Sequence, residues 1–255
     1  MVQIRPSDPH AARPSDAEFR AARAAASAHL DPPRVAPSGA LGGTPSGALE
    51  GTPAGALGGA PARALDATPC GALDEAPSGA LATWIETPLG PMLAVADDQA
   101  LRLLEFPERA VLNAEFRRLR AALGPVREGA SPMLGRVRTV VEGFFADPAT
   151  PMDLPLAPLG SAFQRAVWDA LREIPAGATR SYAQVAARIG RPTATRAVAA
   201  ANGANPIAVL IPCHRVIGAD GKLTGYGGGL WRKRLLLAHE APLAPARPRQ
   251  EPLPL

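Results

Sequence analysis

The sequence lacks most of the features that mark secreted and membrane proteins. Its 255 residues include only two cysteines, which is too few for a disulfide framework and favours a reducing compartment. No apolar run approaches the ~20 residues needed to span a bilayer, and no basic segment followed by an apolar one marks a secretory signal. From these absences we expect a soluble, cytoplasmic protein without a membrane partner.

Lysine is scarce as well, and the sequence has no glycine-rich motif of the phosphate-binding kind. Only Lys222 and Lys233, among 27 basic residues, are lysines. A glycine-rich loop spans residues 223–229, but it matches neither the Walker-A nor the dinucleotide-binding pattern, so we expect no phosphate cradle there.

Charge is distributed unevenly along the chain, whose formal net charge is +4. Residues 1–82 carry 6 arginines against 8 acidic residues, a balance of −2, whereas residues 161–240 carry 11 basic against 4 acidic residues, a balance of +7. A basic excess on one segment suits a polyanionic partner such as nucleic acid.

Proline-rich repeats fill much of the amino-terminal third. Six consecutive units of eight residues read Pro-x-x-Ala-Leu-x-x-x, the first beginning at Pro37 and the last at Pro77. A proline every eight residues interrupts helices, and one leucine per unit cannot build a core. We therefore predict that residues 1–82 form a disordered low-complexity tail, in which residues 17–30 are at most transiently helical and Cys70 is no catalytic candidate.

Residues 83–159 are predicted to form a small α+β unit. Three strands, at residues 83–87, 91–96 and 100–106, are separated by short turns and so indicate an antiparallel meander. Two helices follow, and Ser131 is the expected N-cap of the second.

Residues 160–240 are predicted to form a mostly helical unit. A helix at 161–174 is followed by a helix capped by Ser181 and by a third at 193–201. A short Gly-Arg-Pro turn joins the last two, which is the helix-turn-helix pattern, whose second helix docks on DNA. Residues 241–255 are predicted to be a disordered tail.

The candidate chemistry centres on the adjacent Cys213 and His214. A free thiol is only about a few per cent thiolate at pH 7, so a nucleophilic cysteine needs a base or a cation nearby. Adjacent side chains rarely point at one spot, so a water would bridge thiol and imidazole. A last helix, at 230–240, ends at Glu240, whose carboxylate could orient an imidazole or simply be solvated. The alternative for the thiol is a buried, inert cysteine.

Together these residues resemble the O6-alkylguanine-DNA alkyltransferases, most closely the bacterial Ogt type and the carboxy-terminal half of Ada. The likeness covers about residues 83–240. It implies an α+β fold, in which a small ribonuclease-H-like antiparallel sheet domain precedes a mostly helical, winged-helix-like DNA-binding domain. The motifs that carry it are Phe163-Gln164-x-x-Val167-Trp168, Ile174-Pro175-x-Gly177-x-Thr179-x-Ser181-Tyr182, Arg196-Ala197-Val198, Asn202 to Pro206, Pro212-Cys213-His214-Arg215-Val216 and Gly225-Tyr226 through Glu240.

The resemblance implies direct-reversal DNA repair without a cofactor or a metal. The protein, a monomer, would bind double-stranded DNA from the minor groove. It would transfer the alkyl group of a flipped O6-alkylguanine, or of O4-alkylthymine, to Cys213 in a single turnover. His214 would deprotonate the thiol through water, Glu240 would orient His214, and Asn205 would brace the active-site turn.

The same likeness assigns the DNA contacts. Tyr182 would press on the phosphate 3′ to the target, Arg196 would fill the space left by the flipped base, and Tyr226 would donate a hydrogen bond to the purine. Gly227 stands where some relatives carry a hydroxyl side chain, so purine contacts there would come from the backbone. The remaining residues assigned to substrate or DNA are Ser181, Arg215 and Val216.

Three other functions fit parts of the pattern. A recognition-only relative would mark alkylated bases without transfer, although such proteins lack the acceptor thiol. A helix-turn-helix regulator would bind an operator and take up no alkyl group. A Cys-His-Glu hydrolase would turn over repeatedly on acyl substrates.

Overall fold

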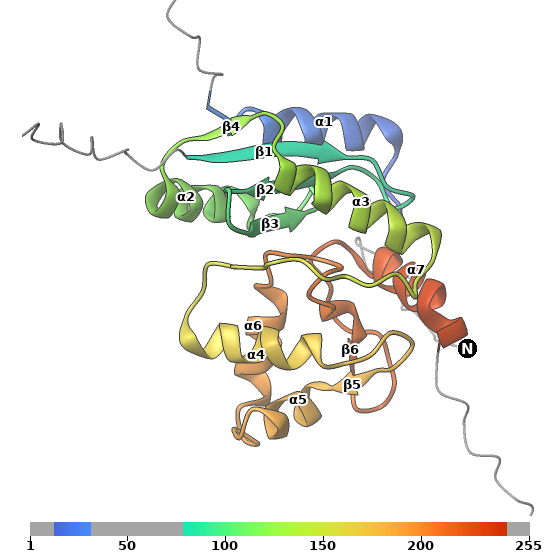
Figure 1. Ribbon diagram of the computed structural model, residues 1–255. Coiled ribbons are helices and arrows are strands. Elements are labelled where there is room, and N and C mark those ends of the chain that lie inside the picture. The colour runs from blue at the N-terminus through green and yellow to red at the C-terminus, as the bar shows by residue number, and fades with distance from the viewer. Residues whose placement is uncertain (1–12, 32–78, 244–255) are drawn as a thin grey trace, which may run out of the picture. The chain divides into compact units, whose positions relative to one another are not determined.

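The computed structural model describes residues 13–31 and 79–243, all of which belong to one compact unit (Figure 1). The fold is α+β, with a small mixed sheet, a two-stranded sheet and several helices. The elements are α1 (Asp16–Ser27), β1 (Ala80–Ile85), β2 (Met92–Ala96), β3 (Leu101–Glu105), α2 (Leu112–Leu123), β4 (Val126–Glu128), α3 (Pro132–Ala146), α4 (Ala162–Arg172), β5 (Arg180–Ser181), α5 (Tyr182–Arg188), α6 (Thr195–Gly203), η1 (Cys213–Arg215), β6 (Val216–Ile217), α7 (Leu230–Glu240) and η2 (Ala241–Leu243).

The larger sheet has the strand order β3-β2-β1-β4. β1 and β2 pair antiparallel, as do β2 and β3, which confirms the predicted meander. The expectation of a wholly antiparallel sheet is wrong, because β4 pairs parallel to β1. The chain reaches β4 through helix α2, and a helical crossover returns the chain in a parallel direction. β4 has only three residues, which is too short for an alternation of apolar and polar residues to reveal it.

Both faces of this sheet are buried, and every residue of β2 is inaccessible to solvent. Met92, Ala94 and Ala96 pack in a core shared with α3, whereas Leu93 and Val95 pack with α1 and α2 on the opposite face. A strand that is covered on both faces reads as a continuous apolar run rather than an alternating one.

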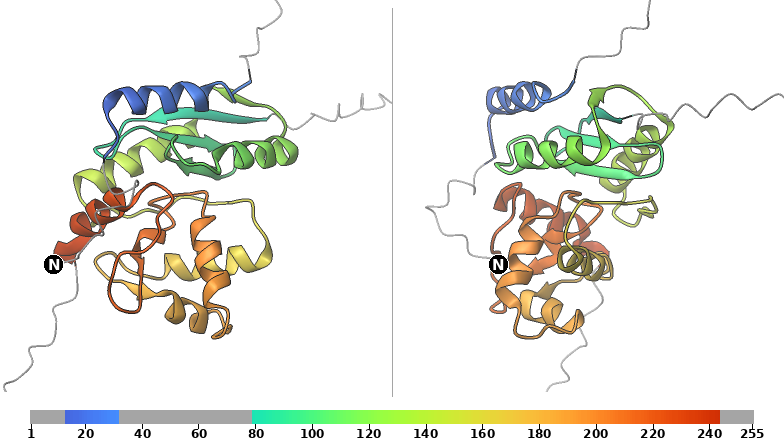
Figure 2. Two further views of the ribbon diagram at one scale, coloured as in Figure 1. Left: turned by 180° about the vertical axis from the view of Figure 1, so that it is seen from behind. Right: turned by 90° about the vertical axis from the view of Figure 1, so that its left-hand side faces the viewer.

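The amino-terminal region differs from the prediction. Residues 16–27, assigned by sequence to the disordered tail, form helix α1, which lies alongside the sheet (Figures 1 and 2). Ser15 and Glu18 cap its start reciprocally, and Phe19 and Ala26 are buried in the two cores. The helix is stable because it buries apolar side chains against the sheet, which local helix propensity alone does not reveal. The octapeptide repeats lie outside the described residues.

The described residues on either side of the repeat-containing segment pair with the backbone at the start of β4. The Asp31 amide donates to the Val126 carbonyl at 2.7 Å, and the Ala80 amide donates to the neighbouring Pro125 carbonyl at 2.9 Å. The Asp31 carboxylate in turn accepts from the Val126 amide at 2.8 Å. The described residues on both sides of segment 32–78 are therefore held by the backbone of residues 125 and 126.

The helices of the carboxy-terminal part follow the sequence prediction within one to three residues. Ser131 caps α3, Ser161 caps α4 and Ser181 caps α5, the last two with a reciprocal glutamine three residues on. None of the helices in the described part of the chain is both long and apolar enough to cross a membrane.

Strand β3 connects the sheet to the segment that carries the candidate nucleophile. The Leu104 amide donates to the Pro206 carbonyl at 2.9 Å, and the Ala208 amide donates to the Leu104 carbonyl at 2.7 Å. The apolar residues at positions 207–211 are all buried in the same core as α3 and α4. This backbone pairing fixes the approach to Cys213 against the edge of the sheet.

Candidate active site

A tight turn places Cys213 and His214 side by side. Pro212 precedes the 3₁₀ turn η1, which begins at Cys213. Upstream, Val209 adopts a φ of 70°, a left-handed conformation that a β-branched residue rarely takes and that costs on the order of 1–3 kcal/mol. Surrounding hydrogen bonds must therefore hold this segment in place.

Asn205 supplies three of those hydrogen bonds. Its Nδ2 donates to the Ile211 carbonyl at 2.8 Å and to the Ile207 carbonyl at 3.3 Å, and its Oδ1 accepts from the Ile207 amide at 3.0 Å. The side chain is 2% exposed, so these bonds form away from water, where an amide must be paired. Asn205 thus spans the strained turn that leads to Cys213.

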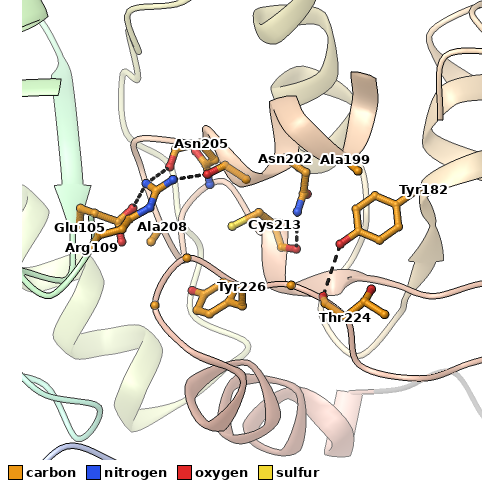
Figure 3. A pocket seen from close by; sticks show the side chains of 14 residues that line it. Glu105, Arg109, Tyr182, Ala199, Asn202, Asn205, Ala208, Cys213, Thr224 and Tyr226 are labelled. Atoms are coloured by element: carbon orange, nitrogen blue, oxygen red, sulfur yellow. Dashed lines mark hydrogen bonds and ion pairs between the residues drawn. The ribbon is translucent and has the colours of Figure 1, made fainter. Parts of the chain in front are cut away.

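Cys213 opens into a cavity of about 380 Å³, shown in Figure 3. This volume lies within the range of small-molecule pockets. The cavity collects residues from β3, α5, α6, the Cys213 turn and the glycine-rich loop. Its lining consists of Glu105, Arg109, Tyr182, Ala199, Asn202, Gly203, Asn205, Ala208, Cys213, Thr224, Gly225, Tyr226, Gly227 and Gly228.

Burial raises the pKa of the Cys213 thiol above its ordinary value, since a thiolate is poorly solvated there. The Asn205 amide and the charges of Arg109 and Lys233 act in the opposite direction, whereas Glu105 adds to the increase. The resting thiol is therefore protonated at neutral pH. A reaction at this sulfur requires a base that removes its proton.

His214, the residue after Cys213, forms a fully buried pair with Glu240. His214 Nε2 lies 3.0 Å from Glu240 Oε1, and both side chains are 0% exposed. Burial lowers the pKa of His214, although the Glu240 hydrogen bond opposes the change, so the imidazole is neutral at pH 7. Burial alone would raise the pKa of Glu240, but hydrogen bonds and charges from His214 and Arg215 lower it to about 2.

This pairing determines which imidazole nitrogen carries the proton. A carboxylate is only an acceptor, so Nε2 must carry the hydrogen and donate it to Glu240. The lone pair then lies on Nδ1, which is buried and has no hydrogen-bond partner among the described residues. His214 therefore presents an unpaired basic nitrogen, which suits a general base.

Arg215 lies elsewhere than predicted. It was expected among the DNA-binding residues, but it is 3% exposed and its Nε and Nη2 donate to the two oxygens of Glu240 at 2.9 and 2.8 Å. Its Nη1 donates to the Ile174 carbonyl. Because the guanidinium is committed to a buried carboxylate, we correct its assignment to a structural partner of Glu240.

Val216 and Ser181 also have structural positions. Val216 is fully buried, its backbone pairs with Arg180, and its carbonyl accepts from Lys233 Nζ at 2.6 Å. The Ser181 hydroxyl accepts from the Gln184 amide as the N-cap of α5. That cap fixes the start of the helix on which Tyr182 is the first residue.

The two tyrosines lie on the walls of the cavity (Figure 3). The Tyr182 hydroxyl donates to the Thr224 carbonyl at 3.4 Å, and burial raises its pKa. The Tyr226 hydroxyl is buried without a hydrogen-bond partner in the described structure, and burial raises its pKa well above the ordinary value. Tyr226 thus holds an unused donor in the cavity that contains the thiol.

Arg196 lies outside the cavity. It is exposed in the first turn of α6, three residues before Ala199, which lines the cavity. Residues three apart share a face of a helix, so Arg196 lies on the face of α6 that carries Ala199.

Sequence reasoning did not identify Glu105, Arg109 and Lys233 as site residues. Arg109 Nη1 donates to the Asn205 carbonyl at 2.6 Å and pairs with the buried Glu105. Lys233 is fully buried, and its Nζ donates to the carbonyls of Val216 and Thr224 at 2.6 and 2.7 Å. Burial lowers the pKa of Lys233 to about 8. One available signal was that Lys233 is one of only two lysines among the 27 basic residues of the chain.

Within residues 13–31 and 79–243, no three His, Cys, Asp or Glu side chains lie close enough together to hold a metal ion.

Comparisons with known proteins match both the sequence and the architecture. The family model described as "6-O-methylguanine DNA methyltransferase, DNA binding domain" matches residues 162–242. The "Methylated-DNA--protein-cysteine methyltransferase" of Methanosarcina acetivorans is 44% identical over 164 residues, covering 61% of this chain and 94% of the relative. The Salmonella typhimurium protein of that name is 46% identical over 162 residues, covering 61% and 92%.

Among solved structures, the crystal structure of Mycobacterium tuberculosis OGT in complex with DNA is similar to this chain. Its TM-score is 0.56 at 42% sequence identity, and the alignment covers 65% of this chain and 96% of that one.

Proposed function

The chain belongs to the methylated-DNA–protein-cysteine methyltransferase family, and we propose from this premise that it repairs alkylated DNA by direct reversal. The substrate is O6-alkylguanine in double-stranded DNA, together with O4-alkylthymine, and the acceptor is Cys213. The observation that carries this proposal is a buried thiol in a cavity of about 380 Å³, followed in the chain by a histidine whose Nε2 is fixed by a carboxylate.

The transfer is a displacement at the alkyl carbon. The Cys213 sulfur, as thiolate, forms a bond to that carbon while the bond from the carbon to guanine O6 breaks, and the electron pair passes to the guanine. The thiol proton moves through water to Nδ1 of His214, whose other nitrogen donates to Glu240. The product is a thioether, which ordinary hydrolysis does not cleave, so each molecule reacts once.

Several residues of the cavity act on the leaving purine and on the turn. The unpaired Tyr226 hydroxyl donates a hydrogen bond to guanine as negative charge develops on it. Asn205 holds the turn that carries the thiol. Lys233 holds the carbonyls of Val216 and of Thr224, a residue of the cavity wall, and its positive charge favours the thiolate.

The target base must leave the duplex to reach the sulfur, because O6 lies inside the base stack. Extrusion costs about a few kcal/mol. Arg196, exposed at the start of α6, enters from the minor groove and fills the space of the flipped base, which offsets part of the lost stacking. Tyr182 and Ser181 at the start of α5 contact the neighbouring phosphate, and backbone groups near Val216 read the purine edge.

The finer architecture follows from the same family membership. We assign residues 83–159 to a ribonuclease-H-like cap domain and residues 160–240 to a winged-helix-like DNA-binding domain. Helices α5 and α6 form the helix-turn-helix, and the pairing of β5 with β6 places the start of α5 next to the Cys213 turn.

Mass spectrometry tests the proposal directly. After incubation with duplex DNA that contains O6-methylguanine, the peptide with Cys213 should gain one methyl group, with about one equivalent taken up per protein molecule. Repaired DNA beside unmodified protein would contradict the proposal, as would repeated turnover. Binding of alkylated DNA without any transfer would instead support the recognition-only alternative.

Replacing Arg196 with alanine should separate base flipping from the chemistry. We expect R196A to repair duplex DNA about tenfold more slowly or worse, since even 1.4 kcal/mol of lost stabilisation is a factor of ten. Transfer from free O6-benzylguanine should stay within about twofold of wild type, because Arg196 lies outside the cavity.

The rates are measured in single-turnover assays on both substrates. Arg136→Ala is the matched control, because Arg136 is exposed on α3 and its loss removes the same charge. An equal loss on free base and duplex would contradict the flipping role of Arg196.

A further inference from the structure

Helix α1 contacts a buried arginine next to the glycine-rich loop. Arg232, in α7, is 1% exposed and forms hydrogen bonds to three separate segments. Its Nε donates to the Leu89 carbonyl at 2.9 Å, its Nη1 to the Gly228 carbonyl at 2.8 Å, and its Nη2 to Glu108 Oε1 at 3.0 Å. Arg232 therefore links the β1–β2 turn, the β3–α2 connection and the loop that carries Tyr226.

Aromatic rings enclose this guanidinium. Its Cζ lies 3.8 Å from the ring centroid of Phe106, 4.6 Å from that of Trp231 and 5.4 Å from that of Phe19. Phe19, from α1, also packs edge-to-face on Trp231 at 6.4 Å. A buried arginine between aromatic faces is stabilised by cation–π attraction, which is stronger where water does not compete for the guanidinium. Of the three rings around Arg232, that of Phe19 belongs to α1.

Phe19 packs closely against the β1–β2 turn. A Cβ built on Gly90, in the β1–β2 turn, would lie 2.8 Å from Phe19 Cε1 and 3.3 Å from Arg232 Nη2. At the opposite side of Arg232, a Cβ on Gly228 would lie 2.9 Å from Phe106 and 3.0 Å from Tyr226 Cε1. A series of close contacts thus runs from Phe19 through Arg232 and Gly228 to Tyr226.

The loop itself needs an external support. Gly225 and Gly229 have φ values of 40° and 92°, and glycine loses more backbone freedom on ordering than any other residue. Pro14, just before α1, lines a second cavity, of about 310 Å³, that shares Tyr226, Gly227 and Gly228 with the first. The support that α1 gives the loop therefore passes through Arg232, which contacts Phe19 and the Gly228 carbonyl.

We propose that α1 is a built-in brace of the active site, in which Phe19 holds Arg232 and Arg232 holds the loop so that Tyr226 faces the reacting guanine. Phe19 and Arg232 are positioning residues, since neither touches the substrate. This inference rests on the proposed alkyl transfer. A misplacement of about 1 Å near reacting atoms can cost up to about a hundredfold in rate.

The full-length protein with Phe19→Ala tests the brace. We expect the single-turnover rate of transfer from free O6-benzylguanine to fall about tenfold, while each molecule still takes up one alkyl group and affinity for undamaged duplex stays within about twofold. A merely structural effect would lower the alkyl-accepting fraction instead of the rate. Phe19→Leu, which keeps apolar cover, should have an intermediate rate, and it replaces the alanine variant if that variant does not fold.

Two further variants complete the experiment. Arg20→Ala is the control, because Arg20 is exposed one residue along the same helix, and it should react like wild type. Arg232→Lys alone should slow transfer, and adding Phe19→Ala to it should slow transfer little further, because both act through one contact.

The brace would be overturned by Phe19→Ala reacting at the wild-type rate, by a rate loss that matches a loss of active molecules, or by effects that multiply with Arg232→Lys. Failure of the wild-type protein to accept any alkyl group would instead overturn the proposed function.

Discussion

Replacing Cys213 with alanine should abolish alkyl transfer, while the protein still folds and binds DNA. The thiol is the acceptor atom, so its removal leaves no sulfur in the cavity to attack the alkyl carbon. Cys213 already borders an open cavity and only one sulfur atom is removed, so the substitution creates little new buried void and costs little stability. Transfer of labelled alkyl groups from duplex DNA should fall below detection, and thermal unfolding should change by only a few degrees.

The chain provides its own control for this prediction. Cys70→Ala removes the only other cysteine, which lies in the repeat segment, and should leave one alkyl group taken up per molecule. Alkyl uptake by Cys213→Ala at the wild-type level would contradict the assignment of the acceptor. An alkyl group found on Cys70 of the Cys213→Ala protein would show that the chain has a second reactive thiol.

Replacing Glu240 with glutamine should lower both stability and reactivity strongly. Glu240 is fully buried and neutralises Arg215, so Glu240→Gln leaves a buried guanidinium without its counter-charge, at a cost of about 3–5 kcal/mol at pH 7. The amide can also donate to His214 Nε2, which would force the proton onto Nδ1 and remove the basic lone pair. We expect transfer about a hundredfold slower or worse.

The stability difference between wild type and Glu240→Gln should depend on pH with a defined sign. The pKa of Glu240 is lowered from 4.5 to about 2 in the folded protein, a difference on the order of 3 kcal/mol. A lowered carboxyl pKa stabilises the protein above about pH 4.5, and this contribution is lost as pH falls towards 2. The free energies of unfolding of the two proteins should therefore converge between pH 4.5 and 2.

Urea unfolding at several pH values measures this convergence. Glu173→Gln is the matched control, because Glu173 forms an exposed ion pair with Arg188 at 2.7 Å, and such pairs contribute only about 0–1 kcal/mol. A stability gap that stays constant from pH 7 to pH 2 would show that Glu240 is not ionised through this range.

The elements near the active site could largely be predicted from the sequence, because their signals are local. Serine N-caps, a glycine that ends α5, and an apolar stripe fix where α3, α4 and α5 begin and end. The Cys-His pair and the Tyr226 loop are contiguous sequence motifs, so they can be recognised without knowledge of the tertiary structure. Residues 213, 226 and 182 accordingly line one cavity, as expected from their likeness to a known family.

The tertiary structure decided what depends on contacts between distant segments. Helix α1 was assigned to the tail from its composition. It is stabilised because Phe19 and Ala26 are buried against residues far along the chain. Arg215 belongs with Glu240 instead of DNA because burial requires a counter-charge, and a sequence does not display burial. Arg109, Arg232 and Lys233 serve the site through backbone carbonyls, and every residue type has such a carbonyl, so no motif could reveal these partners.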